Sequence, residues 1–99
     1  MDPNNPNPIN PADNQIKARI LVVDYFNNHV EKTDALSIGI DDTYVVWFTF
    51  VLGNWKALIS TTVPDGMYYE VTYNRDKGEA YLDAYKKWEN VCIPDGVAF

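Results

Sequence analysis

Few residues of this chain are of a type and spacing that could do covalent chemistry. A single histidine, His29, and a single cysteine, Cys92, could form a base and a nucleophile, and the adjacent Asp41 and Asp42 could hold a cation. Each has a simpler structural interpretation. Cys92 falls in an apolar stripe typical of a core, His29 suits a polar helix end, and paired aspartates commonly form turns. Because Gly-rich phosphate loops and Cys/His zinc spacings are also absent from the sequence, we expect no enzyme, no metal and no cofactor.

Aromatic and hydroxyl side chains instead gather on one side of a predicted sheet. The alternation from Thr43 to Leu52 predicts an inward face of Tyr44, Val46, Phe48, Phe50 and Leu52, and an outward face of Thr43, Val45, Trp47, Thr49 and Val51. In the next run the expected outward residues are Lys56, Leu58, Ser60 and Thr62. The opposite phase, with Trp55, Ala57, Ile59 and Thr61 outward, stays open without the strand register. In the last run, the expected outward residues are Tyr68, Glu70 and Thr72.

An outward surface containing Trp47 and Tyr68 is too apolar to be left in water without a reason, so we expect it to bind something. A second copy of the chain, a partner protein and a small ligand are all compatible with it. A flat aromatic beside hydroxyls and cations suits a nucleotide, which gives a candidate ligand-binding set of Trp47, Lys56, Ser60, Thr62, Tyr68 and Arg75. Tyr and Trp are equally the preferred anchors of protein interfaces, so composition does not choose between these ligands.

An amphipathic helix is predicted before the sheet, from Gln15 to about Glu31. Its apolar stripe is expected to consist of Ile16, Ile20, Val23 and Val30, widened by Val22 and Phe26, with Asp13 or Asn14 as N-cap. Leu21 and Tyr25 fall on the opposite side. Arg19 projects within the apolar arc, where it either reaches out to solvent or pairs with a buried acid.

The remaining elements complete an α+β fold. We expect a short strand within residues 33–42, strands over 43–52, 55–63 and 67–73, and a second helix from Glu79 to about Val91. The second helix is predicted from an aromatic stripe comprising Tyr81, Ala84, Tyr85, Trp88 and Cys92. The short connections favour an α-β-β-β-β-α order, with an antiparallel four-strand meander and both helices on one face.

Length and composition bound the domain organisation and the setting. The chain of 99 residues has an Asn- and Pro-rich segment over residues 1–14, predicted to be a disordered tail, followed by one domain over 15–99. This tail is either a solvated leader or an arm that binds a partner. The net charge of −6 disfavours nucleic acid polymers, and no apolar run is long enough for a membrane helix. One cysteine and no apolar leader favour a cytoplasmic protein.

Three segments carry a resemblance: YVVWF at 44–48, NWKALISTTVPDGMYYEVTYN at 54–74 and YLDAYKKWENVC at 81–92. They resemble a family of short proteins encoded by phages and prophages of Gram-positive bacteria, whose function is unknown, so no functional residues carry over. By analogy, the resemblance implies a counter-defence protein acting in the cytoplasm of the infected host, as a homo-oligomer that sequesters a nucleotide-like immune signal. The alternative is a stoichiometric inhibitor of a host defence protein.

Overall fold

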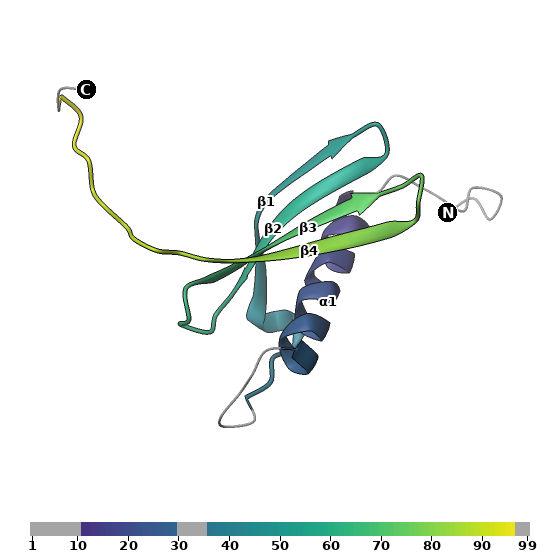
Figure 1. The fold of residues 1–99 in the computed structure, drawn as a ribbon, viewed down its shortest axis with the longest axis horizontal. Helices are drawn as coiled ribbons and strands as arrows, with labels where there is room; N and C mark the ends of the chain where they lie inside the picture. The colour runs from purple at the N-terminus through teal and green to yellow at the C-terminus, as the bar shows by residue number, and fades with distance from the viewer. Residues whose placement is uncertain (1–10, 30–35, 97–99) are drawn as a thin grey trace.

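The computed structural model describes residues 11–29 and 36–96, which form one helix and one antiparallel sheet (Figure 1). The elements follow in the order α1 (Pro11–His29), a 3-10 turn η1 (Ile40–Asp42), β1 (Thr43–Val51), β2 (Asn54–Thr61), β3 (Met67–Asn74) and β4 (Glu79–Lys86). The strands are ordered β1-β2-β3-β4, so each strand pairs with its neighbour in the chain. The predicted α+β class and the four-strand meander are therefore confirmed.

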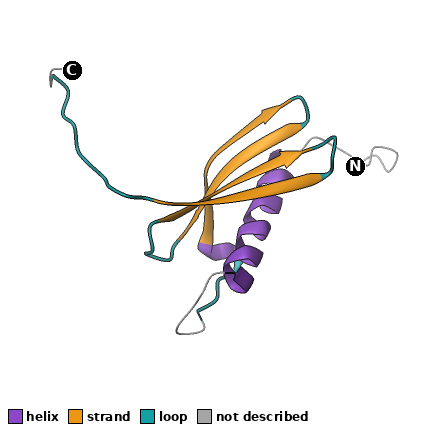
Figure 2. Ribbon diagram, viewed as in Figure 1, coloured by secondary structure: helices purple, strands orange, loops and turns teal. Residues whose placement is uncertain are grey.

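The helix and the sheet make two layers, with α1 crossing one face of the sheet (Figure 2). Side chains alternate between the two faces of the sheet along β2 and β3, so every second one points toward α1 and is covered by the helix. The buried residues that form the core between the two layers are Ala18, Val22, Trp55, Ala57, Ile59, Tyr69 and Val71. Aromatic packing extends this core, because the Trp55 ring stacks on Tyr73 at 5.4 Å between centroids and lies 5.8 Å from Phe48.

Side-chain hydrogen bonds fix the helix against the start of β1. Arg19 Nε donates to Thr43 Oγ1 at 2.9 Å, and Arg19 Nη2 donates to the carbonyl oxygens of Ile40 and Thr43 at 2.9 and 3.1 Å. Arg19 thus follows neither expectation among the described residues: in place of solvent or an acid, its guanidinium binds backbone carbonyls at the turn. Farther along α1, the Asn27 amide exchanges two hydrogen bonds of 2.9 Å with the backbone of Ile38.

The apolar stripe of α1 differs from the predicted one. Leu21 and Tyr25, expected on the opposite side, pack against the core, whereas Ile16 and Ile20 are 43% and 53% exposed. The buried stripe follows Ala18, a small residue that lets the helix approach the sheet and that a search for large apolar side chains overlooks. The helix also begins by Pro11, so the expected N-caps at Asp13 and Asn14 are wrong, and residues 11–14 are helical; residues 1–10 lie outside the described part.

The predicted second helix is wrong, because Glu79–Lys86 is strand β4 and the chain continues as an extended arm over residues 87–96. The apolar spacing there fits a helix, yet β4 pairs with β3 at eight consecutive positions, from Met67 opposite Lys86 to Asn74 opposite Glu79. Tertiary pairing overrides the local pattern, as it does wherever a neighbouring strand offers a free edge. Within residues 11–29 and 36–96, α1 is the one α-helix that packs on the sheet.

The expected short strand within residues 33–42 is also wrong where it can be judged. Residues 36–39 form no regular element and 40–42 form η1, while 33–35 lie outside the described residues. Asp42 holds this turn by accepting a 2.8 Å hydrogen bond from the Gly39 N–H on its Oδ2. The expected strand count of four is thus met by β4 in place of this segment.

A bulge in β1 changes which residues face the helix. The register with β2 shifts between Val45 and Trp47, so the expected phase holds after the bulge, at Phe48 and Phe50, and fails before it. Thr43 is buried, whereas Tyr44 and Val46, expected inward, are 48% and 44% exposed.

The β1–β2 turn lies one residue earlier than expected. Leu52 and Gly53 occupy it with φ of 53° and 84°, and Val51 pairs with Asn54. This two-residue loop needs a positive φ at both positions, which glycine adopts freely and leucine does not. Leu52, expected inward, is 92% exposed.

Candidate functional site

The face of the sheet opposite α1 carries the candidate site. Its central row consists of Trp47, Leu58, Glu70 and Asp83, which lie opposite one another on β1, β2, β3 and β4. The inward phase of Trp55, Ala57, Ile59 and Thr61, all buried, confirms that β2 points Lys56 and Leu58 outward. The outward orientation of Trp47, which is 39% exposed, is confirmed as well.

An open groove of about 410 Å³ lies on this outer face and is lined by Trp47, Leu58, Tyr68, Glu70, Tyr85, Lys86 and Lys87. We call it the outer groove. Aromatic and aliphatic side chains form most of its lining, Glu70 contributes one carboxylate, and two lysines stand at the end of β4. Its size falls within the range of small-ligand and side-chain pockets, roughly 300 to 1,000 Å³.

The six candidate residues do not all line the outer groove. Trp47 and Tyr68 line the outer groove, whereas Lys56 lines a separate hollow of about 190 Å³ with Thr49, Val51 and Thr72. Ser60 is buried and donates to the Met67 carbonyl at 2.9 Å, so its hydroxyl is already satisfied. Thr62 lies past the end of β2. Arg75 lies in the β3–β4 turn beside Gly53, at the other end of the sheet.

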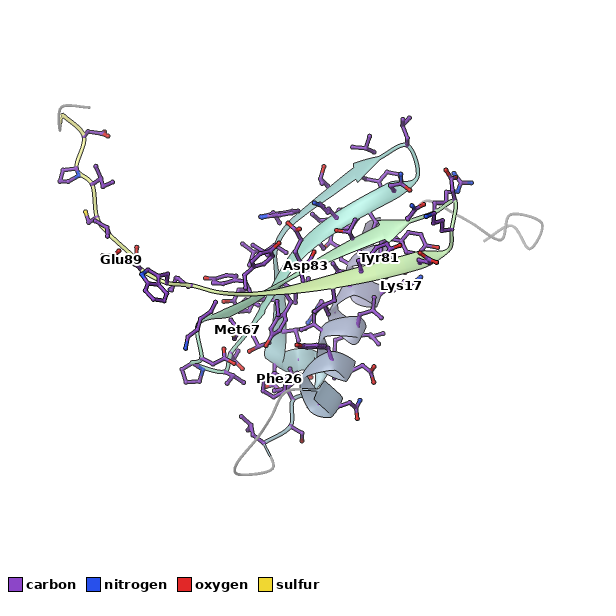
Figure 3. All side chains as sticks on the ribbon, viewed as in Figure 1. Lys17, Phe26, Met67, Tyr81, Asp83 and Glu89 are labelled. Atoms are coloured by element: carbon purple, nitrogen blue, oxygen red, sulfur yellow. The ribbon has the colours of Figure 1, made fainter. Side chains whose placement is uncertain are left out.

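The charged side chains on the outer face are only partly paired with opposite charges. Lys56 Nζ lies 3.4 Å from Glu70 Oε1, an ion pair that leaves this lysine less available to an anion. Glu70 also lies opposite Asp83 on β4, and like charges directly across two strands repel. Asp83 and Tyr81 both lie on β4 (Figure 3). The Tyr81 hydroxyl donates a hydrogen bond to the Glu79 carboxylate at 2.5 Å, and this hydrogen bond raises the pKa of Tyr81.

Three residues of the outer groove were missed from the sequence: Tyr85, Lys86 and Lys87. They lie on β4 and at the start of the arm, which were predicted to be helical, so no register could place Tyr85 opposite Tyr68. A signal was available in the alternation of Ala80, Leu82 and Ala84 with Tyr81, Asp83 and Tyr85, which fits a strand with one aromatic face.

Other kinds of site find little support in the described part of the chain. Within residues 11–29 and 36–96, no three or more His, Cys, Asp or Glu side chains come together as a metal site. Cys92 lies exposed on the arm, outside the core in which it was expected. Among the same residues no helix has both the length and the apolar character of a membrane span.

Comparison with known proteins gives one match, to a family of unknown function designated DUF6275, over residues 15–95. The chain belongs to this family. The matched region takes in the whole sheet, the outer groove and nearly all of the arm, and leaves out the Asn- and Pro-rich start of the chain. No curated protein matches the chain, and no solved structure does.

Proposed function

We propose that this DUF6275 protein is a non-catalytic binding protein that captures a partner protein in the outer groove. The observation that carries the proposal is the groove itself, where Trp47, Tyr68 and Tyr85 lie together on an uncovered sheet face. Large aromatic side chains of this kind are the commonest anchors of protein interfaces, since each buries much apolar area at little entropic cost.

The charges around the groove define the partner that fits it. Glu70 stands among the aromatic residues and lies opposite Asp83, so Lys56, which pairs with Glu70, offsets only part of the negative charge there. The chain also carries a net charge of −6, which attracts basic surfaces at long range. The partner segment that fits has an apolar side chain to fill the groove and a Lys or Arg beside it to reach Glu70. In a phage or prophage setting, which the sequence resemblance implies, the partner would be a host defence protein in the bacterial cytoplasm, and binding would inhibit it.

Matched variants test this proposal. We expect the wild-type protein to retain one stoichiometric partner from host lysate, and Trp47→Ala to lose it, because the main anchor of the groove is removed. Tyr81→Ala is the control, since Tyr81 is 50% exposed on the same strand as Tyr85 but does not line the groove. Equal capture by the wild type and Trp47→Ala would contradict the proposal.

A second candidate function rests on Lys87 of the groove. Lys87 lines the groove with Tyr85 and Tyr68, an arrangement in which a base could stack while a phosphate meets the ammonium group. This candidate is the sequestration of a nucleotide-like immune signal. Calorimetric titration with cyclic dinucleotides and cyclic ADP-ribose variants tests it, and an absence of heat with all of them removes it.

Glu70→Gln separates the two candidates. Removal of this carboxylate weakens the capture of a basic protein segment, because its counter-charge is lost. The same change strengthens the binding of an anionic nucleotide, because a like charge leaves the groove. The two candidates therefore predict affinity changes in opposite directions for Glu70→Gln. The direction alone distinguishes them, whatever the affinity of either ligand.

A further inference from the structure

The two edges of the sheet differ in how well they are protected. The β1 edge carries the bulge between Val45 and Trp47, a feature that disturbs the regular spacing of edge donors and acceptors. The β4 edge has no such irregularity, since β4 pairs with β3 at eight consecutive positions. The regular edge of β4 therefore offers a template on which another strand can pair.

The helix-side face of β4 is poorly covered. α1 packs over β1, β2 and β3, while Ala80 and Ala84 of β4 are exposed and Leu82 is only partly buried. Two alanines flanking a leucine leave a shallow apolar surface beside the helix. A large apolar side chain from another molecule could cover this surface.

The arm carries such side chains, and after Lys87 its described residues belong to no strand. The Lys87 N–H donates to the Gly66 carbonyl at 2.8 Å, and β3 begins one residue later, so the following residues have no neighbouring strand. Trp88 is 94% exposed, and Val91 and Ile93 are 59% and 61% exposed. The arm runs away from the sheet in an extended conformation, with Glu89 well clear of the body (Figure 3).

We propose that β4 and the arm pair antiparallel with the same segments of a second copy, about a two-fold axis that sets Tyr85 opposite the partner's Tyr85. Eight strands then form one continuous sheet. In this register Lys87 lies opposite the partner's Asp83, and Trp88 lies opposite the partner's Leu82, between the partner's Ala80 and Ala84. Each contact occurs twice, as a two-fold interface requires.

The hydrogen bonding of β4 allows this register. The bond from Lys87 to Gly66 shows that the odd-numbered residues of β4 bond to β3. The even-numbered residues, which face α1, therefore present their N–H and C=O groups to the open edge. Trp88 and Leu82 are both even-numbered, so they form a hydrogen-bonded pair with their side chains on the helix side.

Charge pairing and the burial of apolar side chains favour this register over those in which the two-fold axis lies at another residue of β4. With the axis at Asp83, two aspartates face each other. An axis at Lys86 sets Lys86 against itself and Asp83 against Glu89, while an axis at Ala84 sets Leu82 against a lysine. The proposed register instead gives Asp83, which already lies opposite Glu70, a cation from the partner.

This pairing leaves the outer groove open, so it does not depend on the proposed function. The groove ends at Tyr85, Lys86 and Lys87, which border the two-fold axis. The partner's Tyr85 then lies next to each groove and extends its aromatic lining. Two grooves thus form one surface across the dimer.

A single-cysteine experiment tests the register. In a Cys92→Ser background, we expect Tyr85→Cys to form a disulfide-linked dimer on mild oxidation, because non-hydrogen-bonded antiparallel pairs bring Cα atoms to about 4.5 Å. Asp83→Cys in the same background is the control. Its thiols lie on the same face but roughly 13 Å apart in this register, too far for a disulfide. Equal cross-linking of the two variants, or none, overturns the register.

Charge exchange tests the pairing without a disulfide. By sedimentation equilibrium we expect a dimer for the wild type, and Lys87→Glu to raise its dissociation constant about tenfold or more, because two ion pairs become repulsive. Asp83→Lys combined with Lys87→Glu restores the wild-type value. A strictly monomeric wild type, or a double variant as weak as Lys87→Glu, overturns the proposal. Trp47→Ala leaves dimerisation unchanged, so failure of the groove and failure of the edge are distinguishable.

Discussion

Strands β2 and β4 are equal in length and belong to one sheet, yet they are built differently. β2 alternates buried and partly exposed residues from Trp55 to Ile59 and is buried from there to its end, because α1 covers one of its faces and two strands flank it. β4 is exposed at every position except Leu82, which is partly buried. A central strand here holds the fold together, while the edge strand and the arm that follows it remain available for contacts with other molecules.

The largest expected effect is the loss of stability when a large aliphatic side chain is truncated to alanine in each of the two strands. Ile59→Ala in β2 removes a fully buried side chain beneath the helix and should lower the free energy of unfolding by about 2 to 4 kcal/mol. Leu82→Ala in β4 should cost about 1 kcal/mol or less, since that side chain is partly exposed. Chemical denaturation of both variants measures the difference, and equal losses would break the contrast.

A second prediction concerns the polar attachment of the helix. Arg19→Met should destabilise the fold by about 1 to 3 kcal/mol, because three part-buried hydrogen bonds from the guanidinium to Thr43 Oγ1 and to the carbonyls of Ile40 and Thr43 are lost. The Ile40 carbonyl keeps the hydrogen bond that it accepts from Thr43 Oγ1 at 2.7 Å. Lys17→Met is the control on the same helix. Lys17 Nζ lies 4.3 Å above the Tyr73 ring, an exposed cation–π contact worth about 0.5 to 1 kcal/mol. A larger loss for Lys17→Met would show that β3, and not the start of β1, anchors the helix.

A third prediction uses pH to report on the covered face. Burial, aided by the nearby charge of Asp65 and by Tyr25, raises the pKa of Tyr69 from 10.0 to about 12. The folded protein therefore keeps this proton where the unfolded chain loses it, and stability should fall as the pH rises from about 10 to about 12. In thermal unfolding, Tyr69→Phe should lose part of this alkaline dependence. An alkaline dependence that is unchanged in Tyr69→Phe would contradict this prediction.

These contrasts also explain how far the sequence predicts the structure. Strands β1 to β3 were predicted nearly at their observed bounds, because β-branched and aromatic residues, a turn and a Pro-Asp-Gly segment delimit them. The outward phase of Trp47 and Tyr68 followed from the same alternation, whereas the phase of Leu58 stayed open until the register with β1 decided it. β4 was not predicted, because the spacing of Tyr81, Tyr85 and Trp88 suits a helix as well as the outside of a strand, and only the free edge of β3 decides between them.

The candidate site was predicted in part for the same reason. Trp47 and Tyr68 were found because strand phase alone places them on the outer face. Lys56 and Arg75 were grouped with them by charge, and phase cannot reveal that Lys56 pairs with Glu70 or that Arg75 lies beside Gly53. The bulge at Val45 is likewise invisible in the alternation, because only the pairing with β2 creates it.

The smallest expected effect tests whether the arm belongs to the fold at all. In the Lys87→Glu background, studied at a protein concentration well below its raised dissociation constant, removal of the residues after position 87 should change the free energy of unfolding by no more than about 0.5 kcal/mol, because Trp88 is 94% exposed. In the wild-type background the same truncation should lower the unfolding midpoint, and by more at higher protein concentration, because dimerisation stabilises the folded state by mass action. A large loss in the monomeric background would show that the arm folds back onto its own sheet. A loss of stability that appears only in the wild-type background would show that Trp88 stabilises the protein through contacts between chains. We expect this result because α1 leaves β4 and its edge uncovered.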